Sequence, residues 1–150
     1  IVPDCIRAIR EDRAIELRNP ESTRPWQHVL EPLSGYILLA EKLYFHPQAY
    51  SESWNFGPLS NDVRNVGSVA QTIVDIYGSG SVAKNTVKSN FHEANLLQLN
   101  CDLANRKLDW SPRWSVEKTL KMTALWYRSI DEKKSMSDVT NAQINDYFAE

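Results

Sequence analysis

The residues with the clearest chemical potential lie in one short stretch, "RNPESTRPWQHVLEP", at residues 18–32. It holds two arginines, a tryptophan, a histidine and three prolines. Pro25 fixes its own φ and biases Arg24 toward an extended backbone, so the guanidinium projects from a stiff loop. A planar group with five donors suits a phosphate or diphosphate, which it binds through parallel hydrogen bonds. Arg24 could equally pair with a surface glutamate, and the residues alone leave both interpretations open.

Three histidines offer weaker candidates. His28 follows Trp26 by two residues, so we expect both side chains to point the same way along an extended segment and to support Arg24. The pair His92–Glu93 precedes an apolar segment, where loops often line sites, although an exposed or structural pair is the competing interpretation. Neither His28 nor His46 has a cysteine or carboxylate at metal-ligand spacing, so no zinc site is predicted.

Other familiar chemical patterns are incomplete or absent. "SVEK" at residues 115–118 matches Ser-x-x-Lys, but its companion motifs are missing, so Ser115 is predicted to cap a helix. The sequence contains no Gly-rich dinucleotide fingerprint, no Tyr-x-x-x-Lys pair and no Walker motif. These 150 residues are therefore not expected to hold a complete catalytic site.

Composition narrows the class of protein further. The net charge of −2 gives no global basic field, so neither nucleic acid nor an anionic membrane is expected as a partner. No apolar run approaches the roughly 20 residues that span a bilayer. Cys5 and Cys101 lie far apart, which suits a reducing compartment better than a disulfide framework. A cytoplasmic location is therefore expected.

Hydrophobic spacing, caps and breakers predict a helix-rich chain with a few short strands. Predicted helices cover residues 2–11, 30–45, 66–77, 101–108 and 116–130, and a last one begins at a Thr140–Gln143 capping box. Predicted strands cover residues 14–18, 53–57 and 96–100. Residues 130–138 are expected to form either a mobile linker or a solvated turn.

Three short strands cannot make a self-sufficient sheet for these helices. The fold class expected is α/β and helix-rich, with strands that complete a sheet begun upstream. The chain also starts "IVPDCIRAI", without an initiator methionine. We therefore expect residues 1–150 to be the C-terminal region of a longer protein.

With these residues in view, the chain resembles the C-terminal half of CDP-glucose 4,6-dehydratases, in the extended short-chain dehydrogenase/reductase superfamily of nucleotide-sugar enzymes. The resemblance runs from Ile1 to about Tyr127, and "RNPESTRPWQHVLEPLSGYILLAE" is its most specific part. The wider superfamily shows Thr-Arg-Asp-Trp/Phe and then Val-x-Asp here, whereas Pro25 and "QHVLEP" are similar to the CDP-glucose branch. "WNFGP" and "LDWSPRWSVEKTL" resemble two further superfamily motifs.

The resemblance implies a function for a complete enzyme. Tightly bound NAD would take hydride from C4 of the glucose unit, water would leave across C5–C6, and hydride would return to C6. The product would be CDP-4-keto-6-deoxyglucose, a precursor of dideoxyhexoses in bacterial O-antigen. The family's NAD loop and catalytic residues lie upstream of the region matched here. Residues 1–150 are thus expected to be the nucleotide-sugar (substrate) binding region, inactive alone and part of a homodimer in the complete enzyme.

The resemblance also implies site residues. Arg24 matches an arginine that contacts the diphosphate, and Arg18 and Asn19 match residues that flank the nucleoside. Val2 and Pro3 match an Ile-Pro step that packs on the base. No catalytic, cofactor-binding or metal-binding residue is expected in this chain.

His92 matches a position where relatives carry histidine. The following "EAN" lacks a second arginine that relatives use on the diphosphate, so either His92 replaces it weakly or Arg24 carries more of the charge. Alternative functions are another nucleotide-sugar dehydratase or epimerase, and a non-catalytic nucleotide-binding fragment. A free-standing helical interaction module is a third alternative, but it would not explain the stiff loop that carries Arg24.

Overall fold

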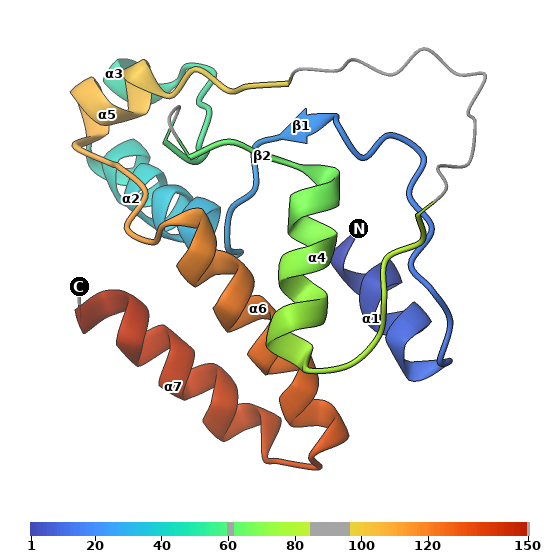
Figure 1. Cartoon of the computed structure of the whole chain (residues 1–150). Coiled ribbons are helices and arrows are strands. Elements are labelled where there is room, and N and C mark those ends of the chain that lie inside the picture. The colour runs from blue at the N-terminus through green and yellow to red at the C-terminus, as the bar shows by residue number, and fades with distance from the viewer. Residues whose placement is uncertain (60–61, 85–96, 150) are drawn as a thin grey trace.

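The computed structural model describes residues 1–59, 62–84 and 97–149. In chain order the elements are α1 (Val2–Arg10), β1 (Thr23–Arg24), α2 (Leu30–Phe45), α3 (Pro47–Tyr50), β2 (Arg64–Asn65), α4 (Val66–Tyr77), α5 (Asp102–Leu108), α6 (Val116–Asp131) and α7 (Met136–Ala149) (Figure 1). The helix-rich fold class is therefore confirmed.

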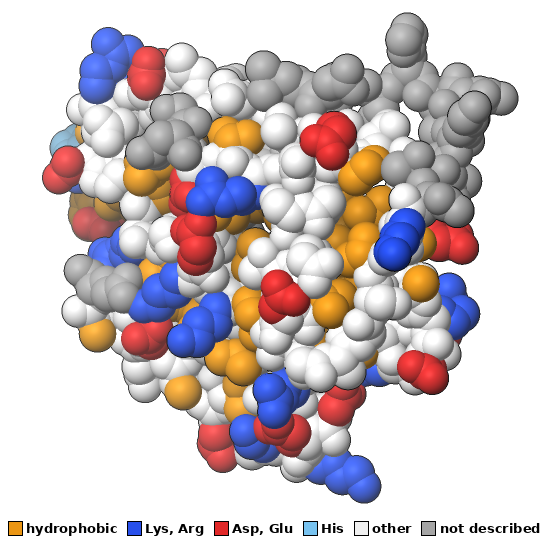
Figure 2. All heavy atoms as spheres, viewed as in Figure 1, with side chains coloured by type: hydrophobic (Ala, Val, Ile, Leu, Met, Phe, Trp, Pro, Cys, Tyr) orange, Lys and Arg blue, Asp and Glu red, His pale blue; other side chains and the backbone are white. Residues whose placement is uncertain are grey.

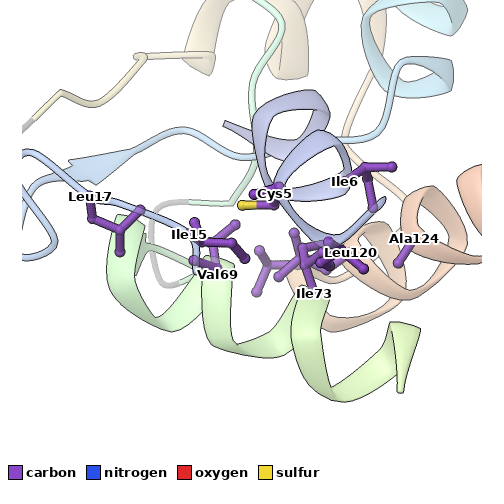
Figure 3. Packing of buried hydrophobic residues seen from close by; sticks show 12 residues of the cluster. Cys5, Ile6, Ile15, Leu17, Val69, Ile73, Leu120 and Ala124 are labelled. Atoms are coloured by element: carbon purple, nitrogen blue, oxygen red, sulfur yellow. The ribbon is translucent and has the colours of Figure 1, made fainter. Parts of the chain in front are cut away.

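The main core lies between α1, α4 and α6. Apolar residues on one face of each helix meet there, because helix positions three or four apart share a face. Two residues of the extended segment 13–19, Ile15 and Leu17, complete this core from the side, with Ile15 beside Val69 of α4 (Figure 3). Its buried members are Cys5, Ile6, Ala8, Ile9, Ile15, Leu17, Val69, Ala70, Ile73, Val116, Leu120 and Ala124.

The two strands form a short antiparallel ladder that joins distant parts of the sequence. Thr23 pairs with Asn65 and Arg24 with Arg64. The Asn65 side chain then caps α4 by accepting a 2.7 Å hydrogen bond from the Ser68 amide. The ladder thus fixes the segment that carries Arg24 directly beside the N-terminus of α4 (Figure 1).

The predicted strands were wrong in position. Residues 14–18 form only an isolated parallel bridge, Ile15 with Val82, and residues 53–57 and 97–100 are not strands. Residue 96, the first of the third predicted strand, lies outside the described residues. The alternation at residues 14–18 is real, because Ile15 and Leu17 are buried while Glu16 and Arg18 are exposed. Alternation indicates an extended backbone, but ladder formation requires a continuous partner.

The helices follow their local signals more closely. Helix α2 spans the predicted residues, Gly78 ends α4 at φ 82°, and the Ser115 hydroxyl accepts from the Lys118 amide at 3.2 Å. Asn100 was expected to cap α5, whose N-cap is instead Cys101; the Asn100 side chain accepts from the Asp102 amide at 2.9 Å.

The capping box of the last helix was wrong, because α7 begins at Met136 and contains both Thr140 and Gln143. The two side chains instead tie α7 to α6. Trp126 Nε1 donates to the Thr140 hydroxyl at 3.0 Å, and Gln143 Nε2 donates to the Met122 carbonyl at 2.8 Å. Residues 132–135 are a tight turn between the two helices.

Within the described residues, no helix is long and apolar enough to cross a membrane. The face shown in Figure 2 carries Lys and Arg side chains interspersed with Asp and Glu, so this face has no single-sign field.

Helix α2 is unusual because it carries apolar side chains all round. Its inner side holds Gly35, whose backbone lies against the Phe56 ring. Its outer side, together with the N-cap residue Val29, exposes a further apolar stripe at helical spacing: Val29, Leu33, Tyr36, Ile37, Tyr44 and Phe45. Helices that are apolar on every side are normally buried in the complete protein.

Candidate functional site

A hollow of about 760 Å³ lies beside α1, the extended segment 13–19 and β1. We call it the arginine hollow. Its charged and polar lining residues are Asp4, Arg7, Arg13, Glu16, Arg18, Asn19 and Arg24. Apolar walls come from Ile1, Trp26 and Val66, among others. Its volume falls in the range of small-molecule sites, and four arginines against two carboxylates give it a net positive lining.

Arg24 enters this hollow from a braced loop. The Trp26 amide donates to the Arg24 carbonyl at 3.0 Å, which closes a tight three-residue turn around Pro25. Trp26 Nε1 donates to the Arg64 carbonyl at 2.9 Å and so fastens the turn to β2. Arg24 itself lies in β1, which confirms its predicted extended backbone, and its guanidinium donates to the Thr23 carbonyl at 2.7 Å.

Three of the predicted substrate-binding residues meet at this hollow. Arg18, Asn19 and Arg24 all line it, although the chain turns between them. The turn is held by the Ser22 amide, which donates to the Asn19 carbonyl at 3.2 Å, and by the Gly67 amide, which donates to the Pro20 carbonyl at 2.8 Å.

The other predicted substrate-binding residues are placed differently. Val2 packs against the main core and Pro3 is exposed in the first turn of α1. Neither lines the hollow, which Ile1 borders at this end. His92 and Glu93 lie outside the described residues.

Trp26 and His28 do not share a side, so that expectation was wrong. Trp26 lines the arginine hollow, whereas His28 lines a separate apolar cavity of about 450 Å³ between residues 27–30, α6 and α7. The chain already turns into α2 here, since the Leu30 amide donates to His28 Nδ1 at 3.3 Å. The imidazole packs 4.9 Å from the Trp114 ring, and its burial lowers the pKa of His28.

Several lining residues were not singled out from the sequence. Arg7 pairs with Asp4 at 3.1 Å, and Arg13 donates through Nε to Glu11 at 2.8 Å. Glu16 makes no hydrogen bond or ion pair with any described residue. Its signal in the sequence was the alternation at residues 14–18, which places Glu16 and Arg18 on the face opposite Ile15 and Leu17.

A buried carboxylate outside the hollow, Glu31, was also missed. It is 0% exposed at the start of α2. It accepts from the Arg113 amide at 3.1 Å, the Trp114 amide at 2.8 Å and the Tyr147 hydroxyl at 2.7 Å. These bonds tie α2 to the turn before α6 and to α7. Burial is the main reason why the pKa of Tyr147 rises to about 12.

Ser34 extends this arrangement, which we call the Glu31 network: Glu31, Ser34, Trp110, Arg113, Trp114 and Tyr147. Ser34 Oγ lies 2.9 Å from the Tyr147 hydroxyl and accepts from Trp110 Nε1 at 2.9 Å. The carboxylate is already saturated by donors, so the network is suited to holding elements together rather than to proton transfer.

The chemistry of the arginine hollow is that of binding. A cationic lining with an apolar wall suits an anionic ligand that also has an apolar part. Across residues 1–59, 62–84 and 97–149, no group of three His, Cys, Asp or Glu residues is placed to hold a metal ion.

No protein-family model matches the chain. The chain is 37% identical over 149 residues to CDP-glucose 4,6-dehydratase of Salmonella typhimurium strain LT2. The match covers 99% of this chain and 42% of that enzyme, so the chain spans about two fifths of the relative's length. The resemblance expected from the sequence is confirmed.

Solved structures show the same fold. UDP-glucuronic acid 4-epimerase from Bacillus cereus, in complex with UDP-glucuronic acid and NAD, matches 86% of this chain and 40% of its own, with a TM-score of 0.72 and 18% identity. dTDP-glucose 4,6-dehydratase from Bacillus anthracis, in complex with NAD, matches 87% of this chain and 40% of its own, with a TM-score of 0.67 and 20% identity. Both show that the chain has the fold of about two fifths of a nucleotide-sugar epimerase or dehydratase chain.

Proposed function

We propose that this chain is the nucleotide-sugar-binding region of an NAD-dependent CDP-glucose 4,6-dehydratase, in which the arginine hollow takes the CDP group. The observation that carries the proposal is the meeting of Arg18, Asn19 and Arg24 at one hollow. These residues come from the segment most specific to the family, and the whole chain is 37% identical to such an enzyme. The complete enzyme would convert CDP-glucose into CDP-4-keto-6-deoxyglucose and water for O-antigen sugar synthesis in the cytoplasm.

Each lining residue has a chemical role in this proposal. Arg24 binds the diphosphate, since a guanidinium forms parallel hydrogen bonds to phosphate oxygens. Arg18 and Asn19 flank the nucleoside with hydrogen-bonding groups. The start of α1 supplies apolar contact for the base through Ile1, which lines the hollow, while Val2 and Pro3 lie outside it and are proposed to support that contact. His92 is proposed as a second, weaker diphosphate ligand.

Binding energy from the CDP group would orient the sugar toward the reacting centre. NAD supplies the acceptor and donor of hydride when it is bound, and we assign it to a part of the complete enzyme outside this chain. The chain alone is therefore proposed to bind nucleotide without turnover.

The outer apolar stripe of α2 supports the assignment of NAD binding to a part of the enzyme outside this chain. A helix that is apolar all round needs cover on both sides, and the residues that the structure describes cover only the side that holds Gly35. The proposed cover is the NAD-binding half, and the complete enzyme is proposed to form a homodimer.

Titration calorimetry with CDP tests the proposal. Arg24→Ala is expected to weaken CDP binding, whereas Arg106→Ala, on the distant α5, serves as a matched loss of one exposed arginine. Equal loss of affinity in both variants would indicate nonspecific charge attraction and would contradict the assigned site.

Another nucleotide-sugar dehydratase or epimerase remains the second candidate, because the solved structures with this fold include enzymes crystallised with UDP-sugars. The two candidates differ in the base that the protein prefers. Comparing CDP with UDP and dTDP in the same titration separates them, and equal affinity for all three would contradict the CDP assignment.

A further inference from the structure

The arginine hollow contains a carboxylate that its phosphate-binding role does not use. Glu16 lies in the extended segment between Ile15 and Leu17, which are 2% and 4% exposed and face the core (Figure 3). Side chains alternate along an extended backbone, so Glu16 and Arg18 project together on the opposite face, with Cα atoms about 7 Å apart. Both line the hollow.

The other lining carboxylate and two of the lining arginines are engaged. The second lining carboxylate, Asp4, pairs with Arg7 at 3.1 Å. Arg13 donates to Glu11. Glu16 has no hydrogen-bond or ion-pair partner among the described residues. An acidic side chain opposes phosphate in a lining that is otherwise cationic, but it can accept a hydrogen bond from a ligand donor.

The two side chains offer opposite hydrogen-bonding chemistry. An ionised glutamate only accepts, and an arginine only donates. Cytosine carries an amino donor at the position where uracil and thymine carry a carbonyl acceptor. Its neighbouring ring nitrogen and carbonyl oxygen accept. An acceptor side chain next to a donor side chain therefore complements cytosine. In uracil a carbonyl oxygen would face the carboxylate instead, and two acceptors repel each other.

We propose that Glu16 and Arg18 recognise the base, with the Glu16 carboxylate accepting from the amino group of cytosine and Arg18 donating to its ring acceptors. The inference rests on the proposed function of the hollow and makes Glu16 a specificity-determining residue. Asn19 and Arg24 then hold the ribose and diphosphate side of the ligand, which all pyrimidine nucleotides share.

Calorimetry with CDP and UDP on the wild-type protein and Glu16→Gln tests this directly. Wild type is expected to bind CDP about tenfold or more tightly than UDP, the size of one good base contact. Glutamine has nearly the same shape but can both donate and accept, so it can serve either base. Glu16→Gln is therefore expected to reduce the preference to about threefold or less.

Asp4→Asn is the matched control, since it removes the same charge from the same hollow. It is expected to change the affinity for both nucleotides by the same factor and to leave their ratio unaltered. A ratio that falls equally in both variants would mean a charge effect and would overturn the role of Glu16.

The outcomes separate this inference from the proposed function. If CDP and UDP bind wild type equally but Arg24→Ala weakens both, the hollow binds nucleotides and Glu16 does not select the base. An unchanged preference in Glu16→Gln also overturns the inference. If neither nucleotide binds, both proposals fail.

Discussion

The arginine hollow and the Glu31 network use the same residue types in opposite ways. In the hollow, Glu16 and Arg18 are exposed on an extended segment, and the carboxylate has no partner among the described residues. In the network, Glu31 is fully buried and three donors point at its two oxygens. A charged group whose hydrogen bonds are satisfied within the protein contributes to structure, whereas one left available at a concave surface contributes to binding.

The Glu31 network and the arginine hollow also differ in how far apart in sequence their residues lie. The donors to Glu31 lie more than 80 residues away in sequence, so the network joins α2 to α6 and α7. The lining of the hollow comes mostly from residues 1–26. We therefore expect substitutions in the network to alter stability and substitutions in the hollow to alter affinity.

Glu31→Ala should give the largest effect. It leaves the Arg113 and Trp114 amides without their acceptor and the Tyr147 hydroxyl with only Ser34 Oγ beside it, and each buried group that loses its partner costs roughly 1–3 kcal/mol. The free energy of unfolding in urea should fall by about 3 kcal/mol or more. A loss below about 1 kcal/mol would break the comparison, because it would mean that the network does not hold the helices together.

Arg24→Ala should affect binding on a smaller scale. Loss of a charge-assisted hydrogen bond is expected to weaken CDP binding by about 1.5–3 kcal/mol, or roughly tenfold to hundredfold. Urea unfolding should remain near that of the wild type, because Arg24 is only partly buried. The comparison fails if the variant loses stability and keeps its affinity.

Gly35→Ala sharpens the structural side of the comparison. An added Cβ would lie 2.3 Å from Phe56 Cδ1, and the Phe56 ring is held edge-on against Trp110 at 5.0 Å. Alanine favours a helix by up to about 1 kcal/mol, but overpacking costs about 1–3 kcal/mol, so we expect a net loss of stability. An increase in the melting temperature would show that Phe56 can move aside.

Tyr147→Phe should give the smallest effect, a change in the ionisation of a single tyrosine. Its pKa of about 12 in the folded protein exceeds the ordinary tyrosine value near 10. The unfolded chain therefore loses this proton first, and the stabilisation, complete below pH about 10, is lost as pH rises toward about 12. Absorbance titration should show that Tyr147→Phe removes a late-ionising tyrosine; removal of one that ionises near pH 10 would contradict the network.

Local signals in the sequence were sufficient for most helices. Pro32 in the first turn, Gly78 after the last and Ser115 at a cap define α2, α4 and α6 because each acts on the backbone within a few residues. The start of α7 was misplaced because Thr140 and Gln143 make tertiary bonds to α6 that resemble a capping pattern in sequence alone.

Features that depend on distant partners were not predicted. The β1–β2 ladder pairs residues about 40 positions apart, and the Glu31 network joins residues up to 116 positions apart. No periodicity encodes such contacts. The family resemblance led us to expect that Arg18, Asn19 and Arg24 lie at one site. The alternation of apolar and polar residues at positions 14–18 also places Glu16 beside Arg18, but this alternation alone does not indicate a binding site.

The most direct test of the central claim is to locate CDP on the protein by amide NMR shifts. The account predicts that CDP shifts the resonances of Glu16, Arg18, Asn19 and Arg24, and leaves Thr123 and Ile144 in the His28-lined cavity unchanged. Shifts confined to that apolar cavity, or none at saturating CDP, would contradict the assignment of the arginine hollow as the nucleotide site.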